Sequence, residues 1–201
     1  MRGLVIAVVV GSLAACGGHG AGARSPAIVA SGERITIAGA PVALYAYPET
    51  IVAYPADDRG AYVVRVGGDA AGVAVRGELE ARAGDDVSGD DGVVVRLSAA
   101  EREALAARAG VVAIEPLQPA QRRSADTGAG TGSGAGTGSG AVEVRIDLFA
   151  DASADEAAAV AAWIASRGGA VTWQGATALT ATLPVDAIAA AARLSPVRWV
   201  E

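Results

Sequence analysis

The chain has 201 residues and a formal charge of −6, with 52% hydrophobic and 19% charged residues, which fits one or two small folded domains. Arginine supplies all 16 basic residues and these form no basic stripe, so the composition argues against nucleic-acid binding, where clustered positive charge supplies most of the affinity. A single cysteine excludes an internal disulfide and any CxxC metal or redox motif.

The N-terminus has the pattern of a bacterial export signal. A short basic segment precedes an apolar run over residues 4–13, which is too short to span a bilayer as a stable helix. The motif Leu13-Ala-Ala-Cys16 resembles the lipobox of bacterial lipoproteins. The resemblance implies that residues 1–15 are a signal peptide and that an acylated Cys16 anchors the protein in the cell envelope, at the outer membrane or the outer face of the cytoplasmic membrane. The alternative is an ordinary signal peptide with a chance cysteine.

Residues 16–60 are expected to form a tether and an irregular arm. The tether is rich in small residues and holds His19, the single histidine. A catalytic base needs packed neighbours that orient it, so His19 is not expected to act as one. The arm contains short β-forming stretches broken by prolines. Its tyrosines, Tyr45, Tyr47 and Tyr54, are expected to half-bury against a neighbouring domain.

A first module is predicted over residues 61–119. Apolar residues alternate with others along 62–66, which is typical of a half-buried strand. Residues 69–84 are predicted to form a helix with Val75 and Leu79 facing inward. Two glycines within this helix each cost about 1 kcal/mol relative to alanine, so the helix needs support from packing.

Two further stretches are predicted to be loops. Residues 84–92 crowd four aspartates together but lack the glycine and glutamate positions of an EF-hand loop, so a solvated acidic turn is the interpretation and no metal site is expected. Residues 120–140 are predicted to be a flexible linker, because positions 127–140 contain only Gly, Ser, Thr and Ala. The modules on either side are therefore expected to be tethered and free to reorient.

The second module is predicted over residues 141–201. Its first strand alternates an aliphatic row with a largely polar one, namely Val142, Val144, Ile146 and Leu148 against Glu143, Arg145, Asp147 and Phe149. A third strand holds Val171 and Trp173, and a fourth turns Thr180 and Thr182 outward. One face of this sheet is therefore expected to be core.

The two modules are interpreted as repeats. The stretch 93–115 aligns without a gap with 179–201. Each module also has a capping box before a helix, formed by Ser98 with Glu101 and by Ser153 with Glu156.

The predicted fold class is α+β, with two tandem ferredoxin-like modules. Strand, helix, strand, strand, helix, strand is the split βαβ or ferredoxin-like order, which places both helices on one face of an antiparallel sheet. The other face of the second sheet would stay open. It is expected to show Phe149, Arg145, Thr180 and Thr182, and so to be available to a partner.

The residues present argue against catalysis. The single histidine lies in the tether, which excludes a Ser-His-Asp site, and no phosphate-binding G-x-G-x-x-G follows a strand. Trp163, Trp173 and Trp199 are expected to fill the core rather than to stack on a ligand. We expect a protein that is not an enzyme and that binds neither cofactor nor metal.

Several of these motifs resemble a known family. The stretch Val144-Arg-Ile-Asp-Leu-Phe149, the alanine-rich helix that ends in Gly-Gly, and the final Leu194-Ser-Pro-Val-Arg-Trp-Val-Glu201 resemble the N-terminal prodomains of bacterial subtilisin-like serine proteases. The resemblance implies that the open sheet face packs on a protease, assists its folding, and helps a C-terminal tail to inhibit it. Phe149 would anchor that interface.

The sequence departs from this family at Glu201, where the family continues through a cleavage site into the protease. Two hypotheses stay open. The chain is a folding assistant or inhibitor of a protease, which includes a truncated or split protease precursor, or it is a generic interaction module of the cell envelope without a protease partner.

Overall fold

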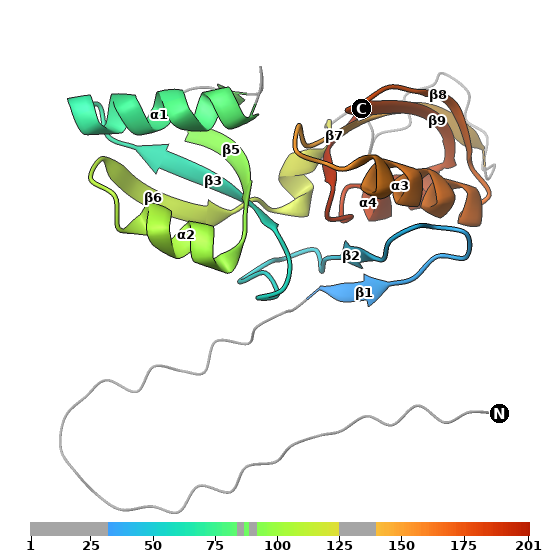
Figure 1. Cartoon of the computed structure of the whole chain (residues 1–201). Coiled ribbons are helices and arrows are strands. Elements are labelled where there is room, and N and C mark those ends of the chain that lie inside the picture. Colours follow the sequence, from blue (N-terminus) through green and yellow to red (C-terminus); the bar gives the residue numbers. More distant parts are fainter. Residues whose placement is uncertain (1–31, 84–86, 89–91, 125–139) are drawn as a thin grey trace, which may run out of the picture.

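The computed structural model describes residues 32–83, 87–88, 92–124 and 140–201 (Figure 1). The chain is α+β, which confirms the predicted class. The predicted signal peptide, Cys16, His19 and most of the acidic turn and linker lie outside the described residues. Within the described residues, no helix has the length and apolar character needed to cross a membrane.

The first half of the chain folds into an antiparallel sheet with two helices. Its elements are β3 (Gly60–Val66), α1 (Ala70–Ala83), β4 (Val87–Ser88), β5 (Gly92–Leu97), α2 (Ala99–Ala106) and β6 (Val111–Pro116). The strands lie in the order β4-β5-β3-β6, and every neighbouring pair is antiparallel. We call this unit the first module.

The second module has the same succession of elements. It consists of β7 (Ala141–Leu148), α3 (Ala154–Ser166), β8 (Ala170–Gln174), β9 (Ala178–Pro184), α4 (Val185–Ala191) and β10 (Val197–Val200). Its strands lie in the order β10-β7-β9-β8, again with antiparallel neighbours. The sequence repeat therefore corresponds to a repeat of secondary structure and of strand order.

Local signals set the ends of two helices as predicted. Both capping boxes are present: the Ser98 and Ser153 hydroxyls accept from the backbone N–H three residues on, and the glutamates there accept from the serine N–H in return. Gly168, with φ of 79°, follows the last turn of α3 and adopts the left-handed conformation that glycine tolerates best.

The core of the first module lies between its helices and its sheet. Val75 and Leu79 of α1 are buried, as their helical spacing predicted. Gly72 is needed in this helix because a Cβ atom there would stand 2.0 Å from the carbonyl oxygen of Gly67. The close approach of α1 to the preceding loop therefore explains a glycine that local propensity disfavours.

The core of the second module is larger and mainly aliphatic. Val144, Ile146 and Leu148 of β7 face α3 and α4, as the alternation predicted, and Trp163 of α3 is buried with them. Trp173 does not join them. It is 57% exposed, so its predicted place in the core is wrong.

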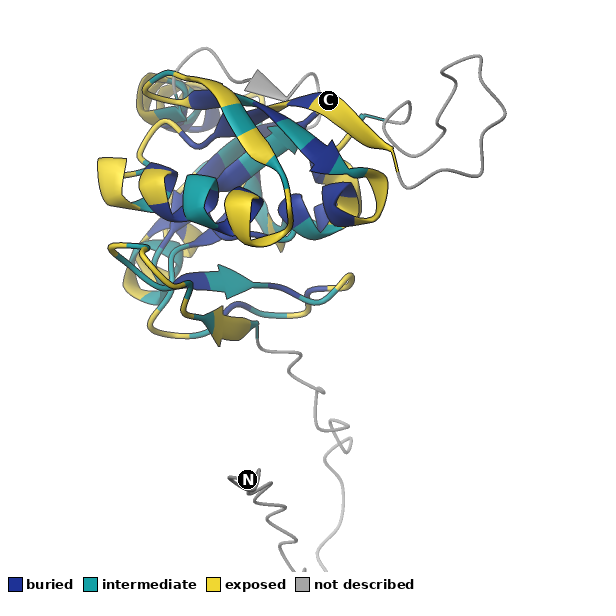
Figure 2. Cartoon of the chain, turned by 90° about the vertical axis from the view of Figure 1, so that its right-hand side faces the viewer, coloured by how far each residue is buried: buried dark blue, intermediate teal, exposed yellow. Residues whose placement is uncertain are grey.

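The arm that precedes the first module packs on the second. Its short strands β1 (Glu33–Ile35) and β2 (Leu44–Ala46) pair with each other and lie below α3 and α4, on the side of the helices away from the sheet (Figures 1 and 2). Backbone hydrogen bonds join Tyr47 N to Arg193 O at 2.9 Å and Ser195 N to Tyr45 O at 2.9 Å. The helices of the second module are thus covered on both sides.

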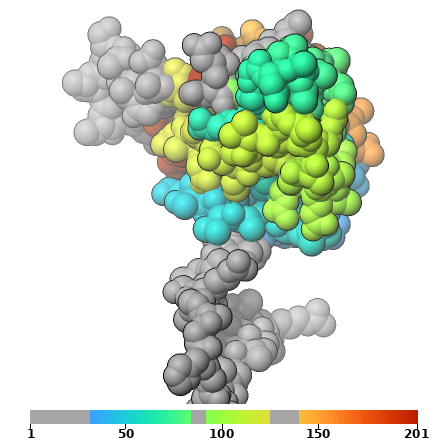
Figure 3. All heavy atoms as spheres, turned by 90° about the vertical axis from the view of Figure 1, so that its left-hand side faces the viewer, coloured from blue at the N-terminus to red at the C-terminus, as the bar shows by residue number. Residues whose placement is uncertain are grey.

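The same arm also reaches into the first module. Leu44 belongs to the second core, whereas Tyr47 and Tyr54 belong to the first, where the two rings meet edge to face at 4.8 Å. Figure 3 shows the cyan atoms of the arm against the yellow-green atoms of the first module. The expectation that the tyrosines bury against a neighbouring domain is confirmed, and Tyr47 is buried almost completely.

The two modules contact each other directly, contrary to the expectation that they reorient freely. Arg96 of the first module forms ion pairs with Asp151 and Glu156 of the second, and Phe149 lies in the core cluster of the first. The 3₁₀ helix η1 (Pro119–Arg122) spans the start of the predicted linker at residue 120, and η1 and the next two residues contact β10. Packing between residues distant in sequence therefore holds the two modules together, although the composition of the linker predicted that they could reorient freely.

Candidate binding surface

Phe149 does not lie on an open surface. It follows the last residue of β7, donates its backbone N–H to Pro196 O at 3.0 Å, and is only 4% exposed. Its ring packs in the core cluster of the first module, which covers this end of the sheet. The prediction that Phe149 anchors a partner on an exposed face is wrong, because another part of the same chain already covers it.

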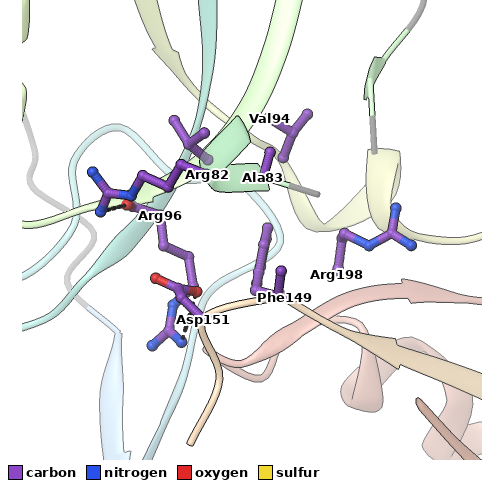
Figure 4. A pocket seen from close by; sticks show the side chains of 9 residues that line it. Arg82, Ala83, Val94, Arg96, Phe149, Asp151 and Arg198 are labelled. Carbon is purple, nitrogen blue, oxygen red and sulfur yellow. Dashed lines mark hydrogen bonds and ion pairs between the residues drawn. The ribbon is translucent and has the colours of Figure 1, made fainter. Parts of the chain in front are cut away.

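Arg96 of β5 is the centre of the charged contact between the modules. Its guanidinium group forms a bidentate pair with Glu156, at 2.7 and 3.3 Å, and lies 3.6 Å from Asp151. Figure 4 shows Arg96 beside Asp151, with Phe149 pointing toward Ala83 and Val94. The Arg96 side chain is only 4% exposed and that of Glu156 is 21% exposed, so this is a partly buried ion pair, and Glu156 also serves the capping box of α3.

The ion pair favours the charged form of both partners, so the pKa of Glu156 falls and the pKa of Arg96 rises. Burial by itself raises the pKa of Glu156, but the hydrogen bonds and charge of Arg96 outweigh it and leave that pKa below its ordinary value. Burial likewise lowers the pKa of Arg96, and Glu156 with Asp151 more than offsets this, so the pKa of Arg96 is raised. Both groups therefore stay charged in the folded protein at neutral pH.

The variant Glu156→Gln keeps a side chain that can complete the capping box but removes the charge. We expect it to lower the free energy of unfolding at pH 7 by about 2 kcal/mol, because Arg96 loses its bidentate carboxylate partner and keeps a longer ion pair with Asp151 and a hydrogen bond to Arg59 O. The pKa of Glu156 is lowered on folding. Its contribution is therefore present above the ordinary value of 4.5 and is lost as the pH falls through the folded value. The difference in the free energy of unfolding between the wild type and Glu156→Gln should therefore become smaller as the pH falls below 4.5.

The measurement is urea unfolding of the wild type and the variant from pH 7 to pH 3. Asp155→Asn is the matched control, since Asp155 lies in the same first turn of α3 but is exposed. Its effect should stay near the few tenths of a kcal/mol of a helix-dipole interaction. A constant gap across the acid range for Glu156→Gln would contradict the ion-pair account.

Arg122 of η1 is a second buried arginine at the module boundary. It is 0% exposed, and in the described part of the chain its guanidinium group has no ion pair. Instead it donates to the carbonyl oxygens of Val197 and Leu194, and to the hydroxyl of Tyr54 at 2.8 Å. Burial lowers the pKa of Arg122. This side chain ties the end of the first module to β10 of the second.

The open face of the second sheet is defined by Arg145, Trp173, Thr180 and Thr182. The register places Thr180 between Arg145 on one side and Trp173 on the other. The neighbours of Arg145, Thr180 and Thr182 along β7 and β9, such as Ala181, are buried, whereas β8 has no buried residue. The predicted outward direction of Arg145, Thr180 and Thr182 agrees with this register. The arm lies on the far side of the helices and leaves this face uncovered (Figure 1).

A β-bulge brings Trp173 to the open face. Val171 pairs with Ala181 but Trp173 pairs with Thr180, so the strand holds one extra residue between them. Without the bulge, Val171 and Trp173 would share a side and Trp173 would point into the core. A strict period of two along 170–174 therefore predicts the wrong face. The nearby Gly175, where a Cβ would stand 2.5 Å from the indole, is the one local sign of a special conformation.

The face carries charges of both signs. Arg145, whose side chain is 59% exposed, pairs with Asp147 at 2.9 Å and approaches the Glu201 carboxylate at 4.0 Å. The hydrogen bond to Asp147 is the main cause that raises the pKa of Arg145. Glu143, which is exposed and pairs in register with Thr182, adds a further negative charge.

The two edges of the second sheet differ. The outer edge of β10 is covered, because Arg123 forms a parallel bridge with Val200 and the Ser124 N–H donates to Val200 O at 2.9 Å. Strand β8 has β9 as its strand neighbour and lies at the opposite edge. Trp173 therefore lies where the open face meets the exposed edge of the sheet.

Comparison with known proteins adds no assignment. No family model, no curated protein and no solved structure matches the chain. In the described residues, no group of three or more His, Cys, Asp or Glu side chains is placed to hold a metal ion. Among the described residues, the open face combines an exposed indole with threonine hydroxyls and a charged group, and it is the candidate binding surface.

Proposed function

We propose that the protein is a non-catalytic binding protein that docks a subtilisin-like protease on the open face of its second module. The observation that carries this proposal is Trp173, an indole 57% exposed at the edge of the open face, next to the hydroxyl side chain of Thr180. Large aromatic residues with a polar surround are the usual anchors of protein interfaces. Trp173 takes the anchoring role that the sequence pattern gave to Phe149.

We infer further that both modules are ferredoxin-like. The shared succession of elements, the equivalent strand orders and the antiparallel pairing support this. Together with the motifs that resemble protease prodomains, they support a role in protease folding or inhibition. Envelope anchoring through a lipid on Cys16 is part of the same proposal, and intact-mass spectrometry of the membrane fraction would detect the lipid as an added mass.

The proposal is tested by titrating the purified protein against subtilisin-like proteases of the source organism. The variant Trp173→Ala should weaken binding by about 1–3 kcal/mol, because it removes the buried anchor of the complex. The fold should be unaffected, since the free protein gains nothing from burying this ring. Fluorescence anisotropy of a labelled protease measures the affinity.

Val185→Ala is the matched control. Val185 is also a large exposed apolar residue of the second module, at 50% exposure, but it starts α4 rather than lying on the sheet. The affinity of the Val185→Ala variant for the protease should equal that of the wild type. No binding of any such protease at high micromolar concentration would end the protease assignment and leave a generic envelope interaction module. Equal losses of protease affinity for Trp173→Ala and Val185→Ala would contradict the assignment of the open face as the binding surface.

A further inference from the structure

A pocket lies where the arm, η1 and α4 meet. It has a volume of about 260 Å³ and is lined by Glu49, Thr50, Pro119, Ala120, Arg123, Ala189 and Arg193. These residues come from three segments that are distant in sequence, and none belongs to the open face. The short yellow helix between the two modules in Figure 1 is η1, which contributes Pro119 and Ala120 to the lining. The pocket is therefore a separate site from the proposed protease surface.

Two guanidinium groups in this pocket have no carboxylate partner in the described part of the chain. Arg193 is held in place by its Nε, which donates to the carbonyl oxygen of Tyr47. Arg123 is fixed through its backbone, which bridges Val200, while its side chain is exposed and forms no ion pair among the described residues. Glu49 lines the same pocket, and among the described residues it forms no salt bridge with either arginine. The pocket walls thus carry two positive charges against one negative charge.

This arrangement fits one monovalent anion better than a dianion. A guanidinium group donates to two oxygens of a carboxylate at once, and its fixed plane favours that geometry. The excess of one positive charge matches a single carboxylate, whereas a phosphate dianion would leave Glu49 facing uncompensated negative charge. Pro119, Ala120 and Ala189 supply an apolar wall for whatever carries the carboxylate.

We propose that this pocket binds a carboxylate carried on a small apolar group, as found at the C-terminus of a peptide or on an acidic side chain next to apolar residues. Arg123 and Arg193 bind the two oxygens, the Thr50 hydroxyl adds a donor, and the apolar wall contacts the carrier. Because Arg193 also holds the arm, the occupied pocket links the arm, η1 and α4 more firmly.

The probes are three short peptides. The first is acetyl-Ala-Ala-Leu with a free C-terminal carboxylate, the second is the same peptide with a C-terminal amide, and the third is acetyl-Ala-Asp-Ala amide. Binding to the full chain is measured by isothermal titration calorimetry and by the shift in melting temperature. Binding of the first peptide alone assigns a C-terminal carboxylate, and binding of the third as well assigns any acidic group on an apolar carrier. Equal behaviour of acid and amide, or no binding at millimolar concentration, overturns the proposal.

Arg123→Gln tests the residue assignment. It should weaken binding of the free-acid peptide by about tenfold or more, the typical effect of losing a charge-assisted hydrogen bond. It should leave the melting temperature of the unliganded protein unchanged, since the side chain is exposed. Arg145→Gln, a charge change on the open face, should bind the peptide as the wild type does. Unchanged peptide binding by Arg123→Gln overturns the site. Neither result bears on the protease proposal, which rests on Trp173.

Discussion

Replacing Arg122 by alanine is expected to lower the free energy of unfolding by about 3–5 kcal/mol. The substitution leaves a cavity in a region with no exposed surface and removes the donors to Val197 O and the Tyr54 hydroxyl. Cavity formation and unpaired buried acceptors each destabilise, and here they act together. Urea unfolding followed by tryptophan fluorescence measures the loss.

Arg123→Ala is the matched control, because it removes the same side chain one position along, where the residue is exposed. Its effect should stay within about 0.5 kcal/mol. Arg122→Met separates the two causes: it refills most of the volume and avoids burying a charge, but it cannot donate hydrogen bonds. We expect it to lie between the wild type and Arg122→Ala. Equal stabilities for the two alanine variants would show that Arg122 does not join the modules.

Phe149→Ala is expected to cost about 3–4 kcal/mol, because it empties a site at which a full aromatic ring is buried. The ring belongs to the second module in sequence and to the first module in packing, where the Arg96 and Arg122 guanidinium groups lie 5.9 Å from its centre. The loss should therefore uncouple the modules. Differential scanning calorimetry should show one transition for the wild type and a broadened or double transition for the variant.

Trp173→Ala is the internal control for this experiment, since it also removes an aromatic ring from the second module but from an exposed position. Its melting curve should match that of the wild type. A Phe149→Ala protein with wild-type stability would mean that the ring is not buried between the modules. It would restore the earlier interpretation of Phe149 as a surface anchor.

The parts of the fold that are set locally could be predicted from the sequence. Capping boxes, the glycine that ends α3 and the spacing of Val75 and Leu79 act within a few residues, and each prediction agrees with the structure. The outward direction of Arg145 and Thr180 follows from strict alternation in two regular strands, and it agrees too.

Residues whose environment depends on distant packing could not be predicted. Phe149 continues the alternation in sequence but lies one residue beyond the strand, where the first module decides its direction. Trp173 changes face through a bulge that no composition rule marks. Arg122 lies in a stretch that the sequence predicts to be a linker, and it is buried because residues of both modules pack on it. For Phe149 and Arg122 the deciding neighbours are far away in sequence, whereas the bulge at Trp173 forms against the neighbouring strand β9.

Because the arm packs on the second module, the start of the described chain can reach its final position only after the end has been made. The hydrogen bond from Tyr45 N to Ser195 Oγ spans 150 positions, and Leu44 packs in a core built from residues beyond 140. During synthesis from the N-terminus, the arm emerges early but finds its site only when nearly the whole chain exists. Contacts between residues so far apart in sequence form slowly, because the intervening chain must be ordered first. The growing chain therefore presents Leu44 to solvent, or to a chaperone, until its last strand is made.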